Sequence, residues 1–251
     1  NILNLLIESI SIHKEYIYFC KSLLGLDDLN QLTKINRDDL KENLLIGKTH
    51  QQLKNLGSHS NKNNNSIFKL LRKEDILLHH PYDLFKTSVE EFINRAADDP
   101  LVMAIKITLY RVSNDSPIIE ALMRAAENGK EIMTLVELKA RFDEDNNIQW
   151  AKQLEQAGIH VVYGIIGFKT HTKIALIVRK EKGRLRNYFH IGTGNYNSNT
   201  SRFYTDLGLL STDPEIATDL LELFNYLSGF SKQKHFQKLL VSPSSMRGKF
   251  I

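Results

Sequence analysis

The sequence predicts an α/β protein in which a mixed sheet is flanked by helices. Between residues 89 and 163, apolar segments of strand length alternate with amphipathic segments of helix length. Two later strand-like segments meet at Lys182-Gly183, which is typical of a hairpin. Strands that alternate with helices join into a sheet through crossover connections, so both patterns indicate one mixed sheet.

Each expected element begins or ends at a cap or a breaker residue. Pro100 stops the first helix, Ser116 and Pro117 begin the second and Gly129 ends it. The expected helices are 89–97, 117–128, 148–157 and 214–227. The expected strands are 101–110, 131–138, 159–163, 173–179 and 186–192.

Composition places the chain among ordinary globular proteins. Of its 251 residues, 42% are hydrophobic and 25% are charged. No apolar run approaches the roughly 18 residues that a membrane span needs. Cys20, the single cysteine, excludes an internal disulfide and suits a reducing compartment. Because the first residue is Asn1 rather than Met, we expect the sequence to be a piece of a longer protein.

Positive charge is concentrated between Lys169 and Arg202, where eight Lys and Arg residues stand against Glu181 as the only acid. The net charge of the whole chain is only +4. A polyanion would bind to such a segment, although a solvated lysine-rich hairpin has the same composition.

His171 and Lys173 are the candidate catalytic pair. They lie two residues apart at the start of a predicted strand, so their side chains share one face. A neutral imidazole nitrogen can attack phosphorus, and an ammonium group can neutralise the phosphoryl oxygens. The pair alone is a weak signal, since most such pairs are polar residues at a strand end.

A glycine loop after the next strand strengthens this interpretation. Glycines in Gly192-Thr-Gly-Asn195 allow backbone N–H groups to approach an anion, and Asn195 can donate to phosphate or orient the histidine. The combination resembles the active-site half-motif of the phospholipase D superfamily. That pattern also has an aspartate five residues after the lysine, where this chain has Val178. The departure counts against a standard phosphodiesterase.

Four further residues are candidates for binding phosphate or nucleotide. Arg111 and Arg141 each follow a predicted strand, at the edge where open α/β sheets bind ligands, although each could instead form a surface ion pair. Tyr204 could stack on a base, although a core aromatic is the default for a tyrosine, and Arg202 could bind phosphate. His79 and His80, which lie on an extended segment, are expected to be structural or to line the site, and His190 is expected to be packed rather than catalytic.

Several segments in order resemble the polyphosphate kinase family. They are Asp75–Asp83, Thr108–Arg111, Val136–Glu144, Lys169–Lys173, His190–Tyr196 and Phe203–Asp206. The resemblance implies a phospholipase D-like fold and a phosphohistidine at His171. It implies that Arg111 and Arg141 belong to the Mg²⁺–ATP phosphate site and that Tyr204 contacts ATP. Since arginine cannot ligate Mg²⁺, the two arginines would act through the phosphates.

The resemblance also implies a domain arrangement. Residues 1–66 would be the end of a preceding middle domain with a polar linker at 57–66, and residues 67–251 the first phospholipase D-like C-terminal domain. A second such domain, which brings a further histidine and arginine to the same site in the family, would be missing. This chain alone would then be inactive, and could act as a non-catalytic polyphosphate-binding fragment.

The implied reaction is reversible transfer of the ATP γ-phosphate to polyphosphate, with Mg²⁺ as cofactor. Its partners would be ATP, ADP and inorganic polyphosphate, without nucleic acid. The full-length enzyme would be a cytoplasmic homo-oligomer, with peripheral association at the inner face of the membrane. The alternative reaction is hydrolysis of a phosphodiester by the same histidine.

Overall fold

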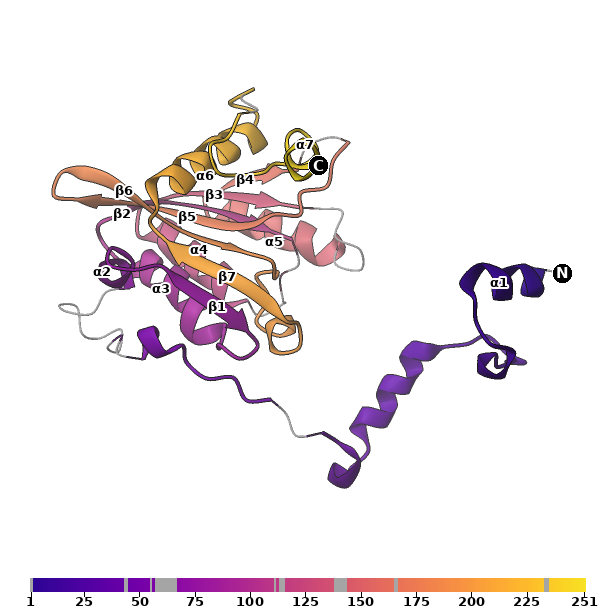
Figure 1. Cartoon of the computed structure of the whole chain (residues 1–251). Coiled ribbons are helices and arrows are strands. Elements are labelled where there is room, and N and C mark those ends of the chain that lie inside the picture. Colours follow the sequence, from indigo (N-terminus) through magenta and orange to yellow (C-terminus); the bar gives the residue numbers. More distant parts are fainter. Residues whose placement is uncertain are drawn as a thin grey trace. The chain divides into compact units, whose positions relative to one another are not determined.

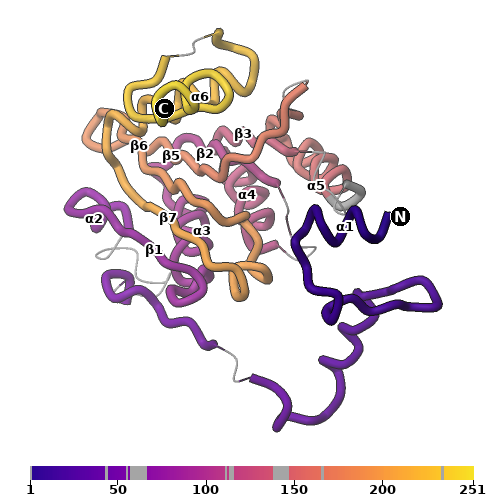
Figure 2. The backbone as a smooth tube through the Cα atoms, turned by 45° about the vertical axis from the view of Figure 1, so that its right-hand side comes forward, coloured from indigo at the N-terminus to yellow at the C-terminus, as the bar shows by residue number. Residues whose placement is uncertain are grey.

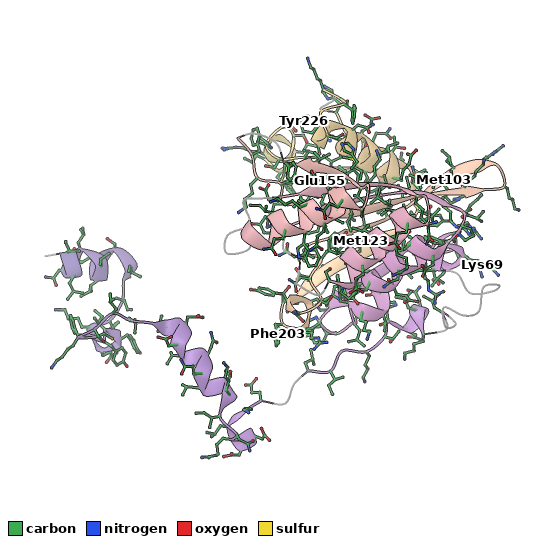
Figure 3. All side chains as sticks on the ribbon, turned by 180° about the vertical axis from the view of Figure 1, so that it is seen from behind. Lys69, Met103, Met123, Glu155, Phe203 and Tyr226 are labelled. Atoms are coloured by element: carbon green, nitrogen blue, oxygen red, sulfur yellow. The ribbon has the colours of Figure 1, made fainter. Side chains whose placement is uncertain are left out.

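The computed structural model describes residues 2–42, 45–54, 56, 67–110, 112, 116–137, 144–164, 167–232 and 235–251. The chain divides into two compact units, Asn1–Leu44 and Leu45–Ile251. The first unit contains the helix α1 (Ile2–Ile10) and three 3-10 helices, which are η1 (Lys14–Tyr16), η2 (Leu26–Lys34) and η3 (Asp38–Leu40). None of its described residues is buried, and Figure 3 shows their side chains spread along a thin path of backbone. This unit therefore has no core of its own among the described residues.

The second unit is built on one seven-stranded mixed sheet, with the strand order β1-β7-β6-β5-β2-β3-β4. The three strands β2, β3 and β4 run parallel, and every other neighbouring pair is antiparallel. The strands are β1 (Ile76–His80), β2 (Val102–Leu109), β3 (Glu131–Val136), β4 (His160–Tyr163), β5 (Lys173–Glu181), β6 (Arg184–Gly192) and β7 (Asp206–Ser211).

Helices cover both faces of this sheet (Figures 1 and 2). One face carries α2 (Ile67–Leu71), α3 (Glu91–Asp98), α4 (Pro117–Glu127) and α5 (Glu144–Gln156), and the other carries α6 (Pro214–Leu227). The short elements η4 (Gln51–Leu53), the π-helix η5 (Lys86–Glu90), η6 (Thr200–Arg202) and α7 (Met246–Phe250) complete the unit. No helix among the described residues is long and apolar enough to cross a membrane.

The alternation of side chains along the strands builds two cores. In β5, Ala175 and Ile177 point into the core under α2 to α5, while Ile174 and Leu176 point into the core under α6. All four are fully buried, as expected for a strand that is covered on both faces. The sheet is therefore the middle layer of three, which confirms the predicted α/β class.

Most predicted elements are present at close to their predicted bounds. The Ser116 hydroxyl caps α4 by accepting a hydrogen bond from Ile119 N, and Pro117 occupies the first helical position. Lys182 and Gly183 both have positive φ, at 47° and 80°, which is the backbone of a tight hairpin turn. The expected strands included neither β1 nor β7. Leu53, which precedes the predicted domain boundary at residue 66, lies in the core of the second unit.

The strand directions bring seven strand ends to one edge of the sheet. The C-terminal ends of β1, β2, β3, β4 and β6 lie there, together with the N-terminal ends of β5 and β7. Tyr110 and Glu137, which follow β2 and β3, are thus on the same edge as Lys173 and Asp206, which begin β5 and β7. We call this the site edge.

The basic segment does not form one patch. Lys169 and Lys173 lie at the site edge, whereas Lys180, Lys182 and Arg184 lie at the far end of the β5–β6 hairpin. At about 3.3 Å per residue, the nine residues of β5 hold these two groups roughly 25 Å apart. The hairpin thus divides the positive charge between the two ends of β5, and binding of a polyanion to this segment stays a prediction.

At the far end of the hairpin, Glu181 is surrounded by cations. Its carboxylate accepts hydrogen bonds from Arg72 Nη1 at 3.0 Å, Arg179 Nη1 at 2.7 Å and the Tyr188 hydroxyl at 2.6 Å. Arg186 Nε lies 3.4 Å away. Burial raises the pKa of Glu181, but the hydrogen bonds from Tyr188 and Arg179 and the charge of Arg72 outweigh it and hold the pKa below its ordinary value. This carboxylate ties α2 to the hairpin.

Candidate active site

Two lysines and a histidine gather around one tyrosine ring at the site edge. The His171 ring lies 5.4 Å from the Tyr110 ring, centroid to centroid, in an edge-to-face arrangement with an interplanar angle of 81°. Over the same ring lie Lys169 Nζ, 5.1 Å from the centroid, and Lys173 Nζ, 5.3 Å from it. Lys173 Nζ also donates a hydrogen bond to the His171 carbonyl oxygen. The predicted His171–Lys173 pair is thus brought together with Lys169.

This environment favours a neutral imidazole. Burial lowers the pKa of His171, and the positive charges of Lys173 and Lys169 lower it further. Burial also lowers the pKa of Lys173 to about 8, although the negative charge of Asp206 acts in the opposite direction. At neutral pH the site therefore presents an unprotonated imidazole nitrogen beside two ammonium groups, as nucleophilic attack on phosphorus requires.

Buried polar side chains fix the segment that carries His171. The Thr108 hydroxyl, on β2, donates to the Thr172 carbonyl at 2.8 Å and accepts from Ile174 N at 3.1 Å. The Glu137 carboxylate accepts from Thr170 N at 2.6 Å. Residues on both sides of His171 are therefore attached to the ends of β2 and β3.

Asn147 joins these two strand ends to α5. Its amide nitrogen donates to the Tyr110 carbonyl at 2.7 Å and to the Glu137 carbonyl at 3.0 Å. Only 1% of Asn147 is exposed, so both bonds are shielded from water. The Asn147 side chain therefore fixes the backbone at the ends of both β2 and β3.

On the other side of β5, Asn195 follows the glycine loop after β6. Its Oδ1 has no hydrogen-bond partner among the described residues, and neither have the Nε2 atoms of His80 and His190. All three residues line one cavity of about 10 Å³, which is room for about one water molecule. The predicted structural role of both histidines fits their burial, at 4% and 3% exposed.

A hydrogen bond at the other ring nitrogen, Nδ1, keeps each of these two histidines in place. His80 Nδ1 donates to the Asp83 carbonyl at 2.6 Å, and His190 Nδ1 lies 2.8 Å from the Tyr196 hydroxyl. Burial, with a smaller contribution from His80, lowers the pKa of His190 to about 3, so this imidazole stays neutral.

The remaining predicted site residues are placed in part. Arg202 and Tyr204 lie in the exposed loop between β6 and β7, which reaches the site edge where β7 begins, and Tyr204 is 63% exposed. The Tyr204 side chain is therefore exposed to solvent rather than packed in the core, and its stacking on a base stays a prediction. Arg111 and Arg141 fall outside the described residues, so their predicted phosphate contacts stay predictions.

An apolar hollow of about 590 Å³ opens beside the His171 segment, on the α6 face. Thr170 and His171 line it on one side. Apolar side chains from α6 and the C-terminal segment line the rest, including Leu220, Leu223, Leu239 and Met246. His171 therefore lies between a polar edge and an apolar wall.

The described residues do not offer a ready metal site. No group of three or more His, Cys, Asp or Glu side chains in the described ranges is arranged to hold an ion. The carboxylates beside the His171 segment and Lys173 already accept hydrogen bonds: Glu137 from Thr170, and Asp206 from the Thr193 hydroxyl at 2.7 Å. Mg²⁺ prefers oxygen ligands in a near-octahedral set, so this arrangement does not fit a resident ion.

Reasoning from the sequence missed five residues of this site: Thr108, Tyr110, Glu137, Asn147 and Asp206. Each is a polar or aromatic residue that lies within or beside a strand end, or at the start of a helix. A polar residue next to a buried strand is the signal that could have found Thr108, Glu137 and Asp206. Asn147 gives no such signal, because its partners are backbone carbonyls distant in sequence.

Comparison with known proteins gives a consistent result. Residues 66–233 match the family profile described as polyphosphate kinase C-terminal domain 1. The chain is 61% identical over 253 residues to a polyphosphate kinase of Prochlorococcus marinus (strain MIT 9313), covering 98% of this chain and 36% of that protein. It is 50% identical over 246 residues to one of Streptomyces coelicolor, covering 98% and 33%.

A solved structure agrees with these relatives. The crystal structure of polyphosphate kinase from Porphyromonas gingivalis matches with a TM-score of 0.74 and 31% identity, covering 97% of this chain and 39% of that one. The chain thus spans about a third of the length of the curated relatives that it matches. The matched profile covers well over half of the chain, and the chain belongs to the polyphosphate kinase family.

Proposed function

We propose that this chain carries the nucleophile for reversible transfer of the ATP γ-phosphoryl group to polyphosphate, through a phosphohistidine at His171. The observation that carries the proposal is the His171 imidazole placed with Lys169 and Lys173 around one ring, where burial and both positive charges lower its pKa. Membership of the polyphosphate kinase family supports the choice of ATP and polyphosphate as substrates.

In the first step, a His171 ring nitrogen attacks the γ-phosphorus of ATP. A P–N bond forms, the bond from phosphorus to the bridging oxygen breaks, and ADP leaves with that electron pair. In the second step, a terminal phosphate oxygen of polyphosphate attacks the same phosphorus and breaks the P–N bond. Imidazole is regenerated and polyphosphate is one unit longer, and the reverse sequence makes ATP.

Cationic and hydrogen-bonding groups would stabilise the charge in both steps. Lys173 and Lys169 lie next to His171 and would neutralise the equatorial phosphoryl oxygens. Asn195 would donate to a phosphoryl oxygen or orient the imidazole. We further propose Arg111 and Arg141 as clamps on the phosphates of ATP.

The exposed loop before β7 would bind the nucleotide. Tyr204 would stack on the base and Arg202 would contact phosphate, and both side chains are exposed at the site edge. A Mg²⁺ ion would be bound by the phosphates of ATP rather than by this chain, because the carboxylates at the edge are engaged and arginine has no lone pair to offer.

The test is to map phosphate in the full-length protein incubated with labelled ATP. We expect label from γ-labelled ATP, in an acid-labile and alkali-stable form, on the peptide that contains His171. ATP labelled at the α-phosphate should give no labelled peptide. Label on a different residue, or from the α-phosphate, would contradict the proposed intermediate.

The alternative phosphodiesterase activity lacks a carboxylate at the position that the half-motif requires. Val178 lies within β5, half-buried and paired with Ala104 and Asn187, five residues from Lys173 and away from the site edge. Release of product from a phosphodiester without ATP would revive this alternative.

The pH dependence of the reaction should report Lys173. Because its pKa is about 8, the ammonium group is lost as the pH rises through that value, and kcat/KM should fall on the alkaline side near pH 8. Lys173→Arg keeps a positive charge to above pH 12, so this alkaline limb should move upward by more than one pH unit.

The matched control is Lys180→Arg, a lysine on the same strand that is exposed and distant from the site edge. It should leave the profile unchanged. An alkaline limb that stays near pH 8 in Lys173→Arg would show that another group controls it.

A further inference from the structure

Tyr110 is the one aromatic ring that contacts every charged or nucleophilic member of the His171 group in the described part of the chain. Its ring meets the His171 imidazole and both lysine ammonium groups, at 5.1 to 5.4 Å from its centroid. Lys169 is exposed and four residues from Lys173, so no strand geometry of its own would hold it beside that lysine. The ring is the feature that the three side chains share.

The backbone that carries the Tyr110 ring is fixed by strand pairing and by a side-chain hydrogen bond. Tyr110 directly follows β2, whose last residue Leu109 pairs with Val136 of β3. The Tyr110 carbonyl accepts a hydrogen bond from buried Asn147. A ring on a pinned backbone can act as a template, because its location does not depend on the flexible groups that it contacts.

We propose that Tyr110 is a positioning residue for phosphoryl transfer, whose ring gathers Lys169 and Lys173 beside His171 so that both ammonium groups meet the transferred phosphoryl group. This inference rests on the proposed function of His171. It adds the means by which two cations are collected before the substrate arrives.

The physical basis is the negative face of the aromatic ring. Two ammonium groups placed near one imidazole repel each other, and in water each would extend into solvent. The ring face attracts both, which offsets that repulsion without introducing a carboxylate that would compete with phosphate. The nearest carboxylates accept hydrogen bonds from other groups, Glu137 from Thr170 N and Asp206 from the Thr193 hydroxyl, and the charge of Asp206 also favours the Lys173 ammonium form.

The test compares Tyr110→Leu with Tyr110→Phe in the full-length protein. Phenylalanine keeps the ring face and should phosphorylate His171 within about threefold of the unmodified rate. Leucine fills similar space without a ring face and should lower that rate by about 10- to 100-fold. Tyr163→Leu is the matched control, because this exposed tyrosine ends the parallel strand β4, which β3 separates from β2, and the change should leave the rate of phosphorylation unaltered.

A second measurement does not depend on activity. Diethyl pyrocarbonate reacts with neutral imidazole, so the pH profile of His171 modification, read by mass spectrometry, gives its pKa directly. We expect Tyr110→Leu to raise the pKa of His171 toward its ordinary value, because the lysines move away and burial decreases, whereas Tyr110→Phe should leave it unchanged.

Lys169→Met extends the test with a change at an exposed position that does not threaten folding. It should raise the pKa of His171 in the Tyr110→Phe background and have little effect in the Tyr110→Leu background, since the ring no longer holds that lysine near. An equal effect of Lys169→Met in both backgrounds would overturn the proposal, as would an unchanged pH profile in Tyr110→Leu.

Failure of the underlying function would look different. If His171→Ala still incorporated phosphate, the phosphohistidine would be wrong, yet the modification profiles would still decide whether Tyr110 gathers the lysines. If Tyr110→Leu and Tyr110→Phe lost activity equally with unmoved profiles, the ring would be excluded as the positioning element.

Discussion

His171→Ala is expected to abolish incorporation of acid-labile phosphate from labelled ATP in the full-length protein, by a factor of at least about 10⁴. Alanine removes both ring nitrogens of His171, one of which forms the proposed P–N bond, while the surrounding cations stay in place. The two buried imidazoles near the site edge, His80 and His190, cannot substitute, because each is less than 5% exposed and fixed by a contact at Nδ1.

The control is His160→Ala, which removes an exposed imidazole at the opposite end of the sheet, where β4 begins. It should keep full incorporation. Retention of the label in His171→Ala with the same acid lability would show that a different residue is phosphorylated. Loss of label in His160→Ala as well would point to a general loss of folded protein.

Glu181→Ala is expected to destabilise the fold by about 3–5 kcal/mol, the largest stability effect that we predict for a single change at the surface of the sheet. The change leaves the buried Tyr188 hydroxyl without its acceptor. It also leaves Arg72, Arg179 and Arg186 facing one another without the shared carboxylate. Equilibrium denaturation at neutral pH measures the difference in the free energy of unfolding.

Glu155→Ala is the matched control, since Glu155 also accepts a hydrogen bond from a tyrosine hydroxyl, that of Tyr163 at 2.8 Å, but at an exposed position. Its expected cost is below about 1 kcal/mol. A cost for Glu181→Ala as small as for this control would show that the arginines are solvated independently of the carboxylate.

The effect of Glu181→Ala should depend on pH in a defined direction. The folded state holds the pKa of Glu181 below its ordinary value, so the stabilisation is complete above about pH 4.3 and is lost as the pH falls through the folded pKa. The difference between the two proteins should therefore shrink only in acid. A difference that stayed constant down to pH 2 would exclude ionised Glu181 as its source.

Local sequence signals were sufficient for most of the fold. Ser116, Pro117 and Gly129 bound α4 because caps and breakers act within a few residues, and the Lys182-Gly183 turn sets the register of its own hairpin. The strand β7 escaped prediction because its residues Asp206–Ser211 include Gly208 and little β-branched character. It is a strand because β1 and β6 supply hydrogen-bonding partners on both sides.

The candidate site was predicted where residues adjacent in sequence act together and missed where they are distant. His171 and Lys173 form a local pair, which the sequence can reveal. Tyr110 contacts that pair although more than sixty residues separate them in sequence. The contact depends on the pairing of β2 with β5, which no local sequence pattern specifies. The far basic residues show the converse, since they are close in sequence to Lys173 but separated from it by the length of a strand.

The position of β5 in the sheet has a consequence for how His171 is held. The chain leaves β4 at one margin of the sheet and enters β5 on the far side of β3 and β2, so the connection must cross the ends of both strands. Three strand spacings are about 14 Å, and the nine residues between Tyr163 and Lys173 could span about 30 Å. Because the connection is longer than this distance, its residues can contact the strand ends that it crosses. Thr170 contacts Glu137 there, and His171 contacts Tyr110. The segment that carries His171 is thus held by two separate contacts, Thr170 with Glu137 and His171 with Tyr110. Either contact can be removed by substitution while the backbone connection stays intact.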